Sequence, residues 1–124
     1  MIDIDHFKQV NDRYGHIVGD LVIQHVANQL RQHIRSSDLV ARYGGDEFLV
    51  LIEGIDMLKA QHIAETIRHD IQHVKLNLAE DEADLIVTVS IGVAVGAESW
   101  MNLLERADQA LFKAKAAGRD RVSA

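Results

Sequence analysis

The sequence of 124 residues contains no cysteine and no proline. Without thiols the chain can form neither disulfides nor thiolate metal sites, a composition typical of proteins that work in a reducing compartment. Its first residues form neither a signal peptide nor a hydrophobic run long enough to cross a bilayer. We therefore expect a cytoplasmic protein and no membrane contact by this segment.

Basic residues are scarce relative to acidic ones, with 13 Lys and Arg against 19 Asp and Glu and a net charge of −6 at pH 7. Proteins that hold DNA or RNA by its phosphates normally carry a basic face, so the composition argues against nucleic acid as a partner. A smaller ligand that carries phosphates would need help from a metal ion. With 48% hydrophobic residues, the chain fits one globular domain over residues 1–124, without room for a second.

The spacing of apolar residues predicts the order of helices and strands. Apolar residues recur at helical spacing over residues 21–34, 58–75 and 103–114, and two short apolar runs predict a β-hairpin over residues 39–52. Alternation predicts a strand over residues 87–95, with shorter strands at the start of the chain and at residues 121–122. This order indicates an α+β fold, a ferredoxin-like or polymerase-palm-like sandwich with a central, mostly antiparallel sheet flanked by helices.

The turn of the predicted hairpin combines two glycines with two adjacent carboxylates, Gly44, Gly45, Asp46 and Glu47. Glycines let a bulky ligand approach the backbone closely. Neighbouring carboxylates repel each other unless a cation or a proton lies between them. The turn is therefore a candidate metal site.

A second pair of acids, Asp3 and Asp5, follows the first predicted strand, and alternation points both to one face. If that strand lies beside the hairpin, Asp3 meets Asp46 and Glu47. Carboxylate oxygens select Mg²⁺ or Mn²⁺, and two such ions could activate an attacking oxygen and stabilise a leaving pyrophosphate. The alternative is that each acid is simply solvated at a strand end or turn.

Residues 42–48, with the sequence Arg-Tyr-Gly-Gly-Asp-Glu-Phe, resemble the signature of the GGDEF family, the diguanylate cyclases. Other segments are similar to further motifs of that family in the same order, namely residues 3–8, 11–12, 15–16, 19–20, 87–94, 107–111 and 114–119. The resemblance extends from residue 1 to residue 122. It implies the condensation of two GTP molecules into cyclic di-GMP with release of two pyrophosphates, with one GTP held by each half of a homodimer.

The resemblance also implies a role for individual residues. It gives Mg²⁺ (or Mn²⁺) three ligands, which are Asp3, the backbone carbonyl of Ile4, and Asp46. Asp46 would also accept the 3′-hydroxyl proton, with Glu47 completing the acidic pair. The implied substrate-binding residues are Asn11 and Asp20 at the guanine with His16 nearby, Gly44 and Gly45 beside the nucleotide, and Lys8, Lys115 and Arg119 at the phosphates.

Several of these residues have simpler interpretations. Lys115 and Arg119 lie near the end of a predicted helix, where the helix dipole favours cations in any protein. Asn11 and Asp20 are common loop and capping residues. The histidines at positions 69 and 73 have the spacing of metal ligands on a helix, but no third ligand is evident and we interpret them as surface residues.

Arg35 and Asp38 match the Arg-x-x-Asp inhibitory product site of the family, which implies feedback inhibition by cyclic di-GMP. An arginine fork suits a phosphate or a guanine edge, and a carboxylate can accept from guanine nitrogens. A second arginine of that site corresponds to Thr66 here, so tight inhibition is not expected. The alternative for Arg35 and Asp38 is a helix-end ion pair.

The sequence departs from the family at its beginning, because the family's first helix and most of its first strand, which precede the position of Asp3, are missing. So short a central strand would leave backbone groups unpaired and part of the core exposed. We expect an N-terminally truncated domain, cut from a longer protein such as the cytoplasmic part of a sensor. The alternative is a domain that borrows cover from a partner chain.

Two other functions fit the same residues. A domain without catalytic activity would be a regulatory module that binds cyclic di-GMP or GTP. A related palm-like nucleotidyltransferase or nucleotide cyclase would use the same metals and release a different product.

Overall fold

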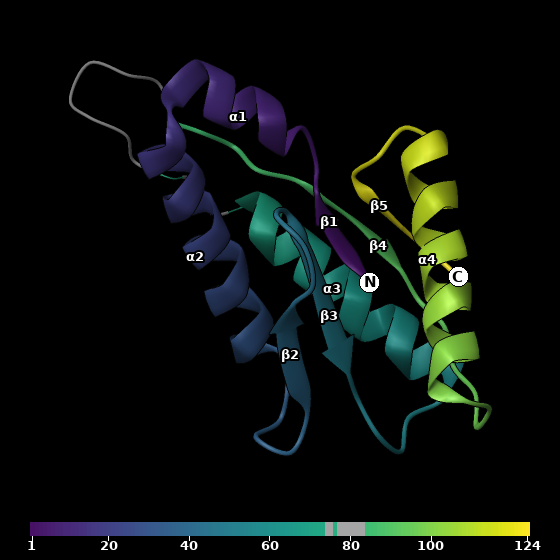
Figure 1. Ribbon diagram of the computed structural model, residues 1–124. Coiled ribbons are helices and arrows are strands. Elements are labelled where there is room, and N and C mark those ends of the chain that lie inside the picture. The colour runs from purple at the N-terminus through teal and green to yellow at the C-terminus, as the bar shows by residue number, and fades with distance from the viewer. Residues whose placement is uncertain (74–75, 77–83) are drawn as a thin grey trace.

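The computed structural model describes residues 1–73, residue 76 and residues 84–124 (Figure 1). Within them, the elements are β1 (Ile2–Ile4), α1 (Phe7–Tyr14), α2 (His16–Gln32), β2 (Leu39–Arg42), β3 (Glu47–Leu51), α3 (Met57–His73), β4 (Val89–Gly92), α4 (Trp100–Ala116) and β5 (Arg121–Ser123). None of these helices is long and apolar enough to cross a membrane.

The strands form one sheet in the order β2-β3-β1-β4-β5. All neighbours pair antiparallel except β4 and β5, which are parallel. The first four strands, with helices between β1 and β2 and between β3 and β4, have the ferredoxin-like arrangement. The predicted α+β sandwich with a mostly antiparallel sheet is therefore confirmed.

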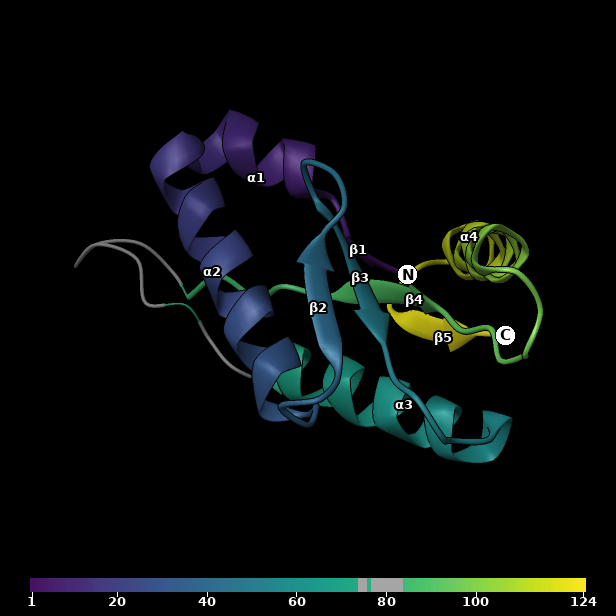
Figure 2. The same ribbon diagram turned by 60° about the horizontal axis from the view of Figure 1, so that its bottom comes forward.

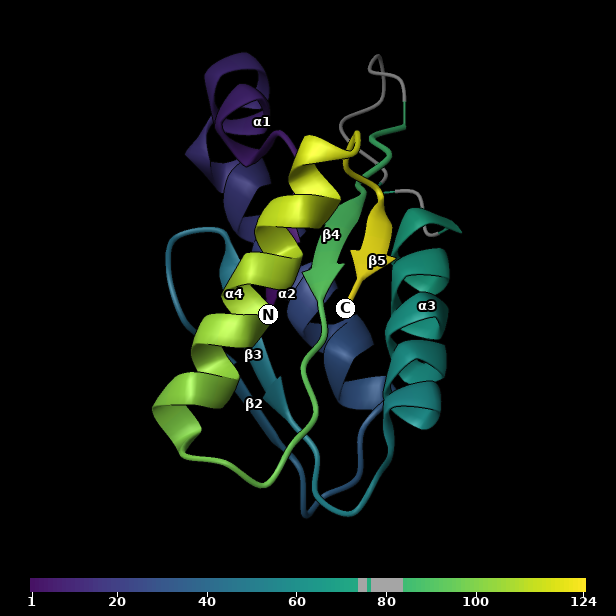
Figure 3. The ribbon, with the colours of Figure 1, turned by 90° about the vertical axis from the view of Figure 1, so that its right-hand side faces the viewer.

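Helices cover both faces of the sheet (Figures 2 and 3). One face packs against α1, α2 and α3, through a core that includes Ile4, Val26 and Ile71. The other face packs against α4 through a smaller cluster that includes Leu49 and Leu111. Because successive residues of β1 alternate between faces, Ile2 and Ile4 join the large core while Asp3 lies on the α4 face.

The sequence prediction missed α1 and placed the start of α2 too late. α1 has eight residues, and His6 before it adopts a left-handed conformation without a side-chain cap. Its apolar residues Phe7, Val10 and Tyr14 pack against the core formed by other elements. So short a helix is stabilised mainly by tertiary packing, which local sequence signals do not report.

The other predicted elements are present with shifted ends. The strand predicted over residues 87–95 is shorter in the structure, where β4 covers Val89–Gly92. α3 ends at His73 within the described part of the chain, and residues 74–75 of the predicted helix lie outside it. The hairpin and β5 fall where they were predicted.

β1 contains only three residues but is paired on both sides. The Met1 amine donates to the Gly92 carbonyl at 3.0 Å, and the Gly92 N–H donates to the Met1 carbonyl at 2.8 Å. Beside Met1 lies an apolar cavity of about 480 Å³, whose lining includes Leu49, Ile67 and Leu104. The core is thus open to this cavity at the N-terminal end of β1.

Candidate functional site

A polar hollow of about 280 Å³ lies at the C-terminal end of β1. Its lining includes Asp3 and Ile4 from β1, Lys8 from α1, Asp46 from the hairpin turn, and Lys115 and Arg119 from the end of α4 and the turn after it. Four separate segments therefore supply residues that the sequence analysis assigned to metal or phosphate. Gly44 and Gly45 of the same turn, and Glu47 at the start of β3, do not line the hollow.

The pairing of β1 with β3 brings the acids together. Asp3 lies directly opposite Glu47 in the register of the two strands, and the Ile4 N–H donates to the Asp46 carbonyl at 3.0 Å. Asp3 is buried, and this burial raises the pKa of its carboxyl to about 6, with the charges of Asp46 and Glu47 adding to the rise. The predicted approach of Asp3 to the hairpin acids is therefore observed.

Lys115 forms an ion pair with Asp3 from the last turn of α4. Burial lowers the pKa of the Lys115 ammonium, but its hydrogen bond with Asp3 and the nearby charges of Asp3, Glu47 and Asp46 outweigh that and raise it. Lys115 thus does more than satisfy the helix dipole, because its charge offsets part of a dense acidic cluster.

The acidic cluster fits a divalent cation whose coordination is completed by phosphates. No group of three or more His, Cys, Asp and Glu side chains among residues 1–73, 76 and 84–124 could hold a metal by itself. The predicted ligands are only two carboxylates, Asp3 and Asp46, and one carbonyl, that of Ile4. Mg²⁺ is commonly bound in this way, by one or two carboxylates together with substrate phosphates. Burial first, and then the charges of Asp46 and Glu47, raise the pKa of Asp3, and a bound cation would favour its ionised form.

Arg42 holds the acidic turn in shape, a role that the sequence analysis missed. Its guanidinium donates to the carbonyl of Gly44 at 3.2 Å and to that of Gly45 at 2.7 Å. The Tyr43 N–H donates to the Glu47 carbonyl at 2.8 Å and closes the hairpin. An added Cβ at Gly45 would meet no atom within 4 Å, so this part of the turn is open to a ligand.

Asp5 is a second residue whose role was missed, although its acidic character was noted. Its carboxylate accepts hydrogen bonds from the hydroxyls of Thr88 and Ser90, at 2.8 and 2.7 Å, and from the Asp120 N–H at 3.0 Å. Ser90 is paired with Asp3 across β1 and β4, so Asp5 reaches the same face of the sheet as Asp3. The two acids share a face, as predicted, but they have different partners.

The residues assigned to guanine lie on α1 and the start of α2, outside the lining of the polar hollow. The side-chain oxygen of Asn11 is buried and has no hydrogen-bond partner among the described residues. An added Cβ at Gly19 would overlap this oxygen, so the glycine makes room for Asn11. His16 and Asp20 are exposed nearby on α2.

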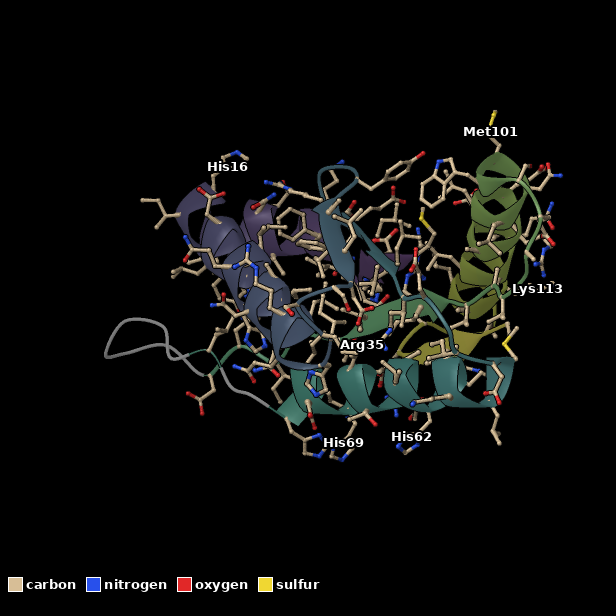
Figure 4. All side chains as sticks on the ribbon, turned by 90° about the horizontal axis from the view of Figure 1, so that it is seen from below. His16, Arg35, His62, His69, Met101 and Lys113 are labelled. Atoms are coloured by element: carbon tan, nitrogen blue, oxygen red, sulfur yellow. The ribbon has the colours of Figure 1, made fainter. Side chains whose placement is uncertain are left out.

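The predicted product site is formed by Arg35 and Asp38, in the loop after α2. The Arg35 guanidinium donates to the two carboxylate oxygens of Asp38 at 3.0 and 3.2 Å, and also to the Glu53 carbonyl at 2.8 Å. This hydrogen bonding with Arg35 lowers the pKa of Asp38. Thr66 lies on α3, where its hydroxyl donates to the His62 carbonyl at 2.9 Å. In Figure 4, Arg35 and His16 lie near opposite ends of α2.

The histidines at positions 69 and 73 are exposed and stack with ring centroids 4.0 Å apart. Figure 4 shows His62 and His69 pointing outward from α3. The histidines at positions 69 and 73 are therefore surface residues, as interpreted from the sequence.

Comparison with known proteins gives consistent results. Residues 1–121 match the family model described as diguanylate cyclase, GGDEF domain. Diguanylate cyclase A of Treponema denticola is 41% identical over 99% of this chain, and the probable diguanylate cyclase DgcT of Escherichia coli is 44% identical over 98%. The chain spans 33% and 28% of the lengths of these two relatives.

Solved structures with the same fold are also similar in sequence. The GGDEF domain of DgcB from Caulobacter crescentus, in complex with c-di-GMP, matches with a TM-score of 0.91 and 36% identity over 98% of this chain and 73% of that one. The GGDEF domain of YfiN from Pseudomonas aeruginosa matches with a TM-score of 0.89 and 38% identity, over 99% of this chain and 79% of that one.

Proposed function

Because the chain belongs to the GGDEF family of diguanylate cyclase domains, we propose that it condenses two GTP molecules into cyclic di-GMP and releases two pyrophosphates. Each half of a homodimer holds one GTP. The domain works in the cytoplasm, where GTP is available. The observation that carries this proposal is the convergence of Asp3, Asp46, Lys8, Lys115 and Arg119 on one small hollow.

The three cations of the hollow bind the phosphates of GTP. The chain has a net charge of −6, so a triphosphate needs a local positive region. Lys8, Lys115 and Arg119 provide it from α1, α4 and the following turn. Charge-assisted hydrogen bonds from ammonium and guanidinium groups to phosphate oxygens are stronger than neutral ones, and they stabilise the charge that develops on the leaving pyrophosphate.

Asp3, Asp46 and the Ile4 carbonyl hold Mg²⁺, or Mn²⁺, together with the phosphates. When bound, the ion favours ionisation of the 3′-hydroxyl and neutralises phosphate charge. Asp46 accepts the proton of the 3′-hydroxyl, a role that suits a carboxylate on an open turn at the rim of the hollow. Glu47, opposite Asp3, adds negative charge that keeps the cation in place.

Asn11 and Asp20 read the guanine edge, with His16 beside them. The unpaired oxygen of Asn11 supports this assignment, because a buried acceptor without a partner costs about 1–3 kcal/mol and a guanine N–H would satisfy it. Gly44 and Gly45 let the nucleotide lie against the turn, and the open space at Gly45 is consistent with that.

The experiment is incubation of the purified chain with GTP and Mg²⁺, followed by separation and mass identification of the products. The wild-type chain should make cyclic di-GMP and pyrophosphate, and Asp46→Ala should make none. The matched control is Glu105→Ala, which removes a carboxylate from the exposed surface of α4. A different nucleotide product from the wild type would instead indicate a related nucleotidyltransferase. Cyclic di-GMP made by Asp46→Ala would refute the metal and proton-acceptor roles.

A second candidate is a catalytically inactive module that binds cyclic di-GMP or GTP. It is favoured by the preformed pair of Arg35 and Asp38, which lies outside the polar hollow with the arginine exposed. The DgcB domain, which has this fold, was solved with c-di-GMP. Calorimetric titration with cyclic di-GMP should give binding that Arg35→Ala removes, and binding without any product from GTP would support this second function. Because Thr66 replaces the second arginine, we expect weak inhibition.

A further inference from the structure

Asp5 is a buried carboxylate to which the proposed mechanism gives no role. It is 7% exposed, and among the described residues it forms no ion pair. Its partners are three donors, the hydroxyls of Thr88 and Ser90 and the N–H of Asp120. A buried carboxylate is costly unless its oxygens are well hydrogen-bonded, so this site is built around those three bonds.

The bond to Asp120 reaches an unusual turn. Gly118, Arg119 and Asp120 have φ angles of 119°, 63° and 46°, so two consecutive residues other than glycine adopt the left-handed conformation. Each such residue costs on the order of 1 kcal/mol and persists only where its surroundings hold it. This turn follows α4 and carries Arg119 into the polar hollow.

Asp120 is held from two sides. Its N–H donates to Asp5, and its carboxylate accepts from the Arg68 guanidinium of α3 at 2.8 Å. Arg68 is fixed in turn by Glu65. Of these two contacts, the bond to Asp5 acts on the backbone of the turn. It acts together with the Arg119 N–H, which donates to the Ala114 carbonyl at 3.0 Å, and the Arg121 guanidinium, which donates to the Arg119 carbonyl at 3.0 Å. These bonds together set the dihedral angles that aim Arg119.

We propose that Asp5 is a positioning residue that holds the turn at Arg119 and Asp120, and so places the Arg119 guanidinium for a phosphate of the nucleotide. The proposal rests on the proposed function for the identity of that nucleotide. The two acids, which both line the hollow, then have different roles: Asp3 pairs with Lys115, and Asp5 accepts from the backbone of the turn that carries the arginine.

The three donors explain why position 5 carries a carboxylate. One oxygen accepts from Ser90, and the other accepts from both Thr88 and Asp120. An asparagine could keep one oxygen on Thr88 and Asp120 and donate its amide to the Ser90 hydroxyl, but that oxygen is a neutral acceptor and forms weaker hydrogen bonds than a carboxylate. Asp5→Asn should therefore fold but hold the turn less well than the wild type, and Asp5→Ala should not hold it.

The first test is amide hydrogen exchange of the free protein. Asp5→Ala should exchange the Asp120 amide about tenfold faster or more, because the acceptor of that amide is gone. Ser90→Ala is the matched control, since it removes a bond to Asp5 but leaves the bond between Asp5 and Asp120. Unchanged exchange at Asp120 in Asp5→Ala, or equal acceleration in Ser90→Ala, would overturn the proposal.

The second test separates positioning from general damage. Asp5→Ala and Arg119→Ala should each raise the KM for GTP about tenfold, with a smaller change in kcat and no change in the Mg²⁺ concentration required. In an Arg119→Ala background, Asp5→Ala should raise the KM no further. If the two substitutions raise the KM by factors that multiply in the double variant, or if Asp5→Ala lowers only kcat, Asp5 does not act through Arg119.

If Asp5→Ala does not fold, Asp5→Asn decides the question in the same way. Its increase in KM should vanish in the Arg119→Ala background, and an increase of equal size in both backgrounds, or none in either, would refute the proposal. A wild-type chain that makes no cyclic di-GMP would refute the proposed function, while the exchange experiment would still test the hold of Asp5 on the turn.

Discussion

The two ends of β1 differ in nearly every physical respect. At its C-terminal end, a hollow of about 280 Å³ collects acids and cations from several segments. At its N-terminal end, a cavity of about 480 Å³ is lined mostly by aliphatic side chains of β3, α3, α4 and the segment after β4. The larger opening is therefore not the one with the chemistry.

Local strain is concentrated at the polar end. Among the described residues, the positive φ angles outside glycine are those of His6, Arg119 and Asp120, and the first two line the polar hollow. The raised pKa of Asp3 is found there as well. Strained backbone and unfavourable charges persist only where the rest of the fold holds them in place. The comparison suggests that the polar end lowers the stability of the fold for the sake of ligand binding. The apolar layers provide the stability that compensates for this loss.

The largest effect should come from removing the charge of the Lys115 side chain at the polar end. Lys115→Met should lower kcat/KM for GTP by about 100-fold or more, because it removes the proposed phosphate contact and leaves Asp3 without its partner. Steady-state kinetics with GTP and Mg²⁺ would measure this. Lys113→Met is the control, since it removes the same charge from an exposed position on the same helix. Equal losses in both variants would mean that only the overall charge matters.

The next effect concerns the contact between sheet and helix at the apolar end. An added Cβ at Gly92 would overlap the Ala107 carbonyl and the Leu111 backbone nitrogen of α4. Backbone atoms cannot move aside as a side chain can, so Gly92→Ala should lower the free energy of unfolding by about 3 kcal/mol. Urea denaturation would measure it. Gly45→Ala, in the open turn, should change stability by less than about 0.5 kcal/mol. An unchanged midpoint for Gly92→Ala would mean that α4 does not lie so close to β4.

Much of the fold could be predicted from the sequence because it follows from periodicity. The hairpin, α3 and α4 have long or strongly alternating apolar patterns, and each was found within a few residues of its ends. α1 was missed although Phe7, Val10 and Tyr14 stand at helical spacing, because only eight residues carry the pattern and the start of the helix has no capping side chain. Its packing against α2 and the core stabilises it as a helix.

The site was predictable in part, and for two different reasons. The approach of Asp3 to the hairpin was predicted on the condition that the first strand lies beside it, and the pairing of β1 with β3 meets that condition. The approach of Lys115 and Arg119 to the same point depends on how α4 packs across the sheet, which no spacing in the sequence reports. Only the family resemblance suggested it. The hold of Asp5 on Asp120 spans 115 positions and had no signal beyond the presence of an acid.

A smaller effect should appear in the pH dependence of stability, which Asp3 changes at the polar end. The pKa of Asp3 is raised from 3.8 to about 6, so between these values the folded protein binds more protons than the unfolded chain. Stability contributed by Asp3 is therefore lost as pH rises through this window, and its ionised form remains a cost at pH 7. Without divalent metal, Asp3→Asn should be more stable than the wild type at pH 7, by on the order of 1–3 kcal/mol, and nearly equal at pH 4.

Urea denaturation at pH 4, 5 and 7 would measure this difference. Addition of Mg²⁺ should reduce it at pH 7, because the ion relieves the cost of the carboxylate in the wild type only. A wild type that is more stable than Asp3→Asn at pH 7 without metal would contradict the claim that the polar end lowers stability.

The smallest effect tests whether Gly19 is needed for nucleotide binding and not for the stability of the fold. An added Cβ at Gly19 would overlap the side-chain oxygen of Asn11, which can swing away, so Gly19→Ala should displace Asn11 without disturbing the backbone. Alanine within α2 is favoured over glycine by about 1 kcal/mol, so stability should be unchanged or raised. The KM for GTP should rise about tenfold, for loss of one hydrogen bond to the base. Asn11→Ala should raise it similarly, and the double variant no further, because both changes act on one contact. A fall in stability with unchanged KM would instead make Gly19 a packing residue like Gly92, and the contrast between the start of α2 and the apolar layer would not hold at that position.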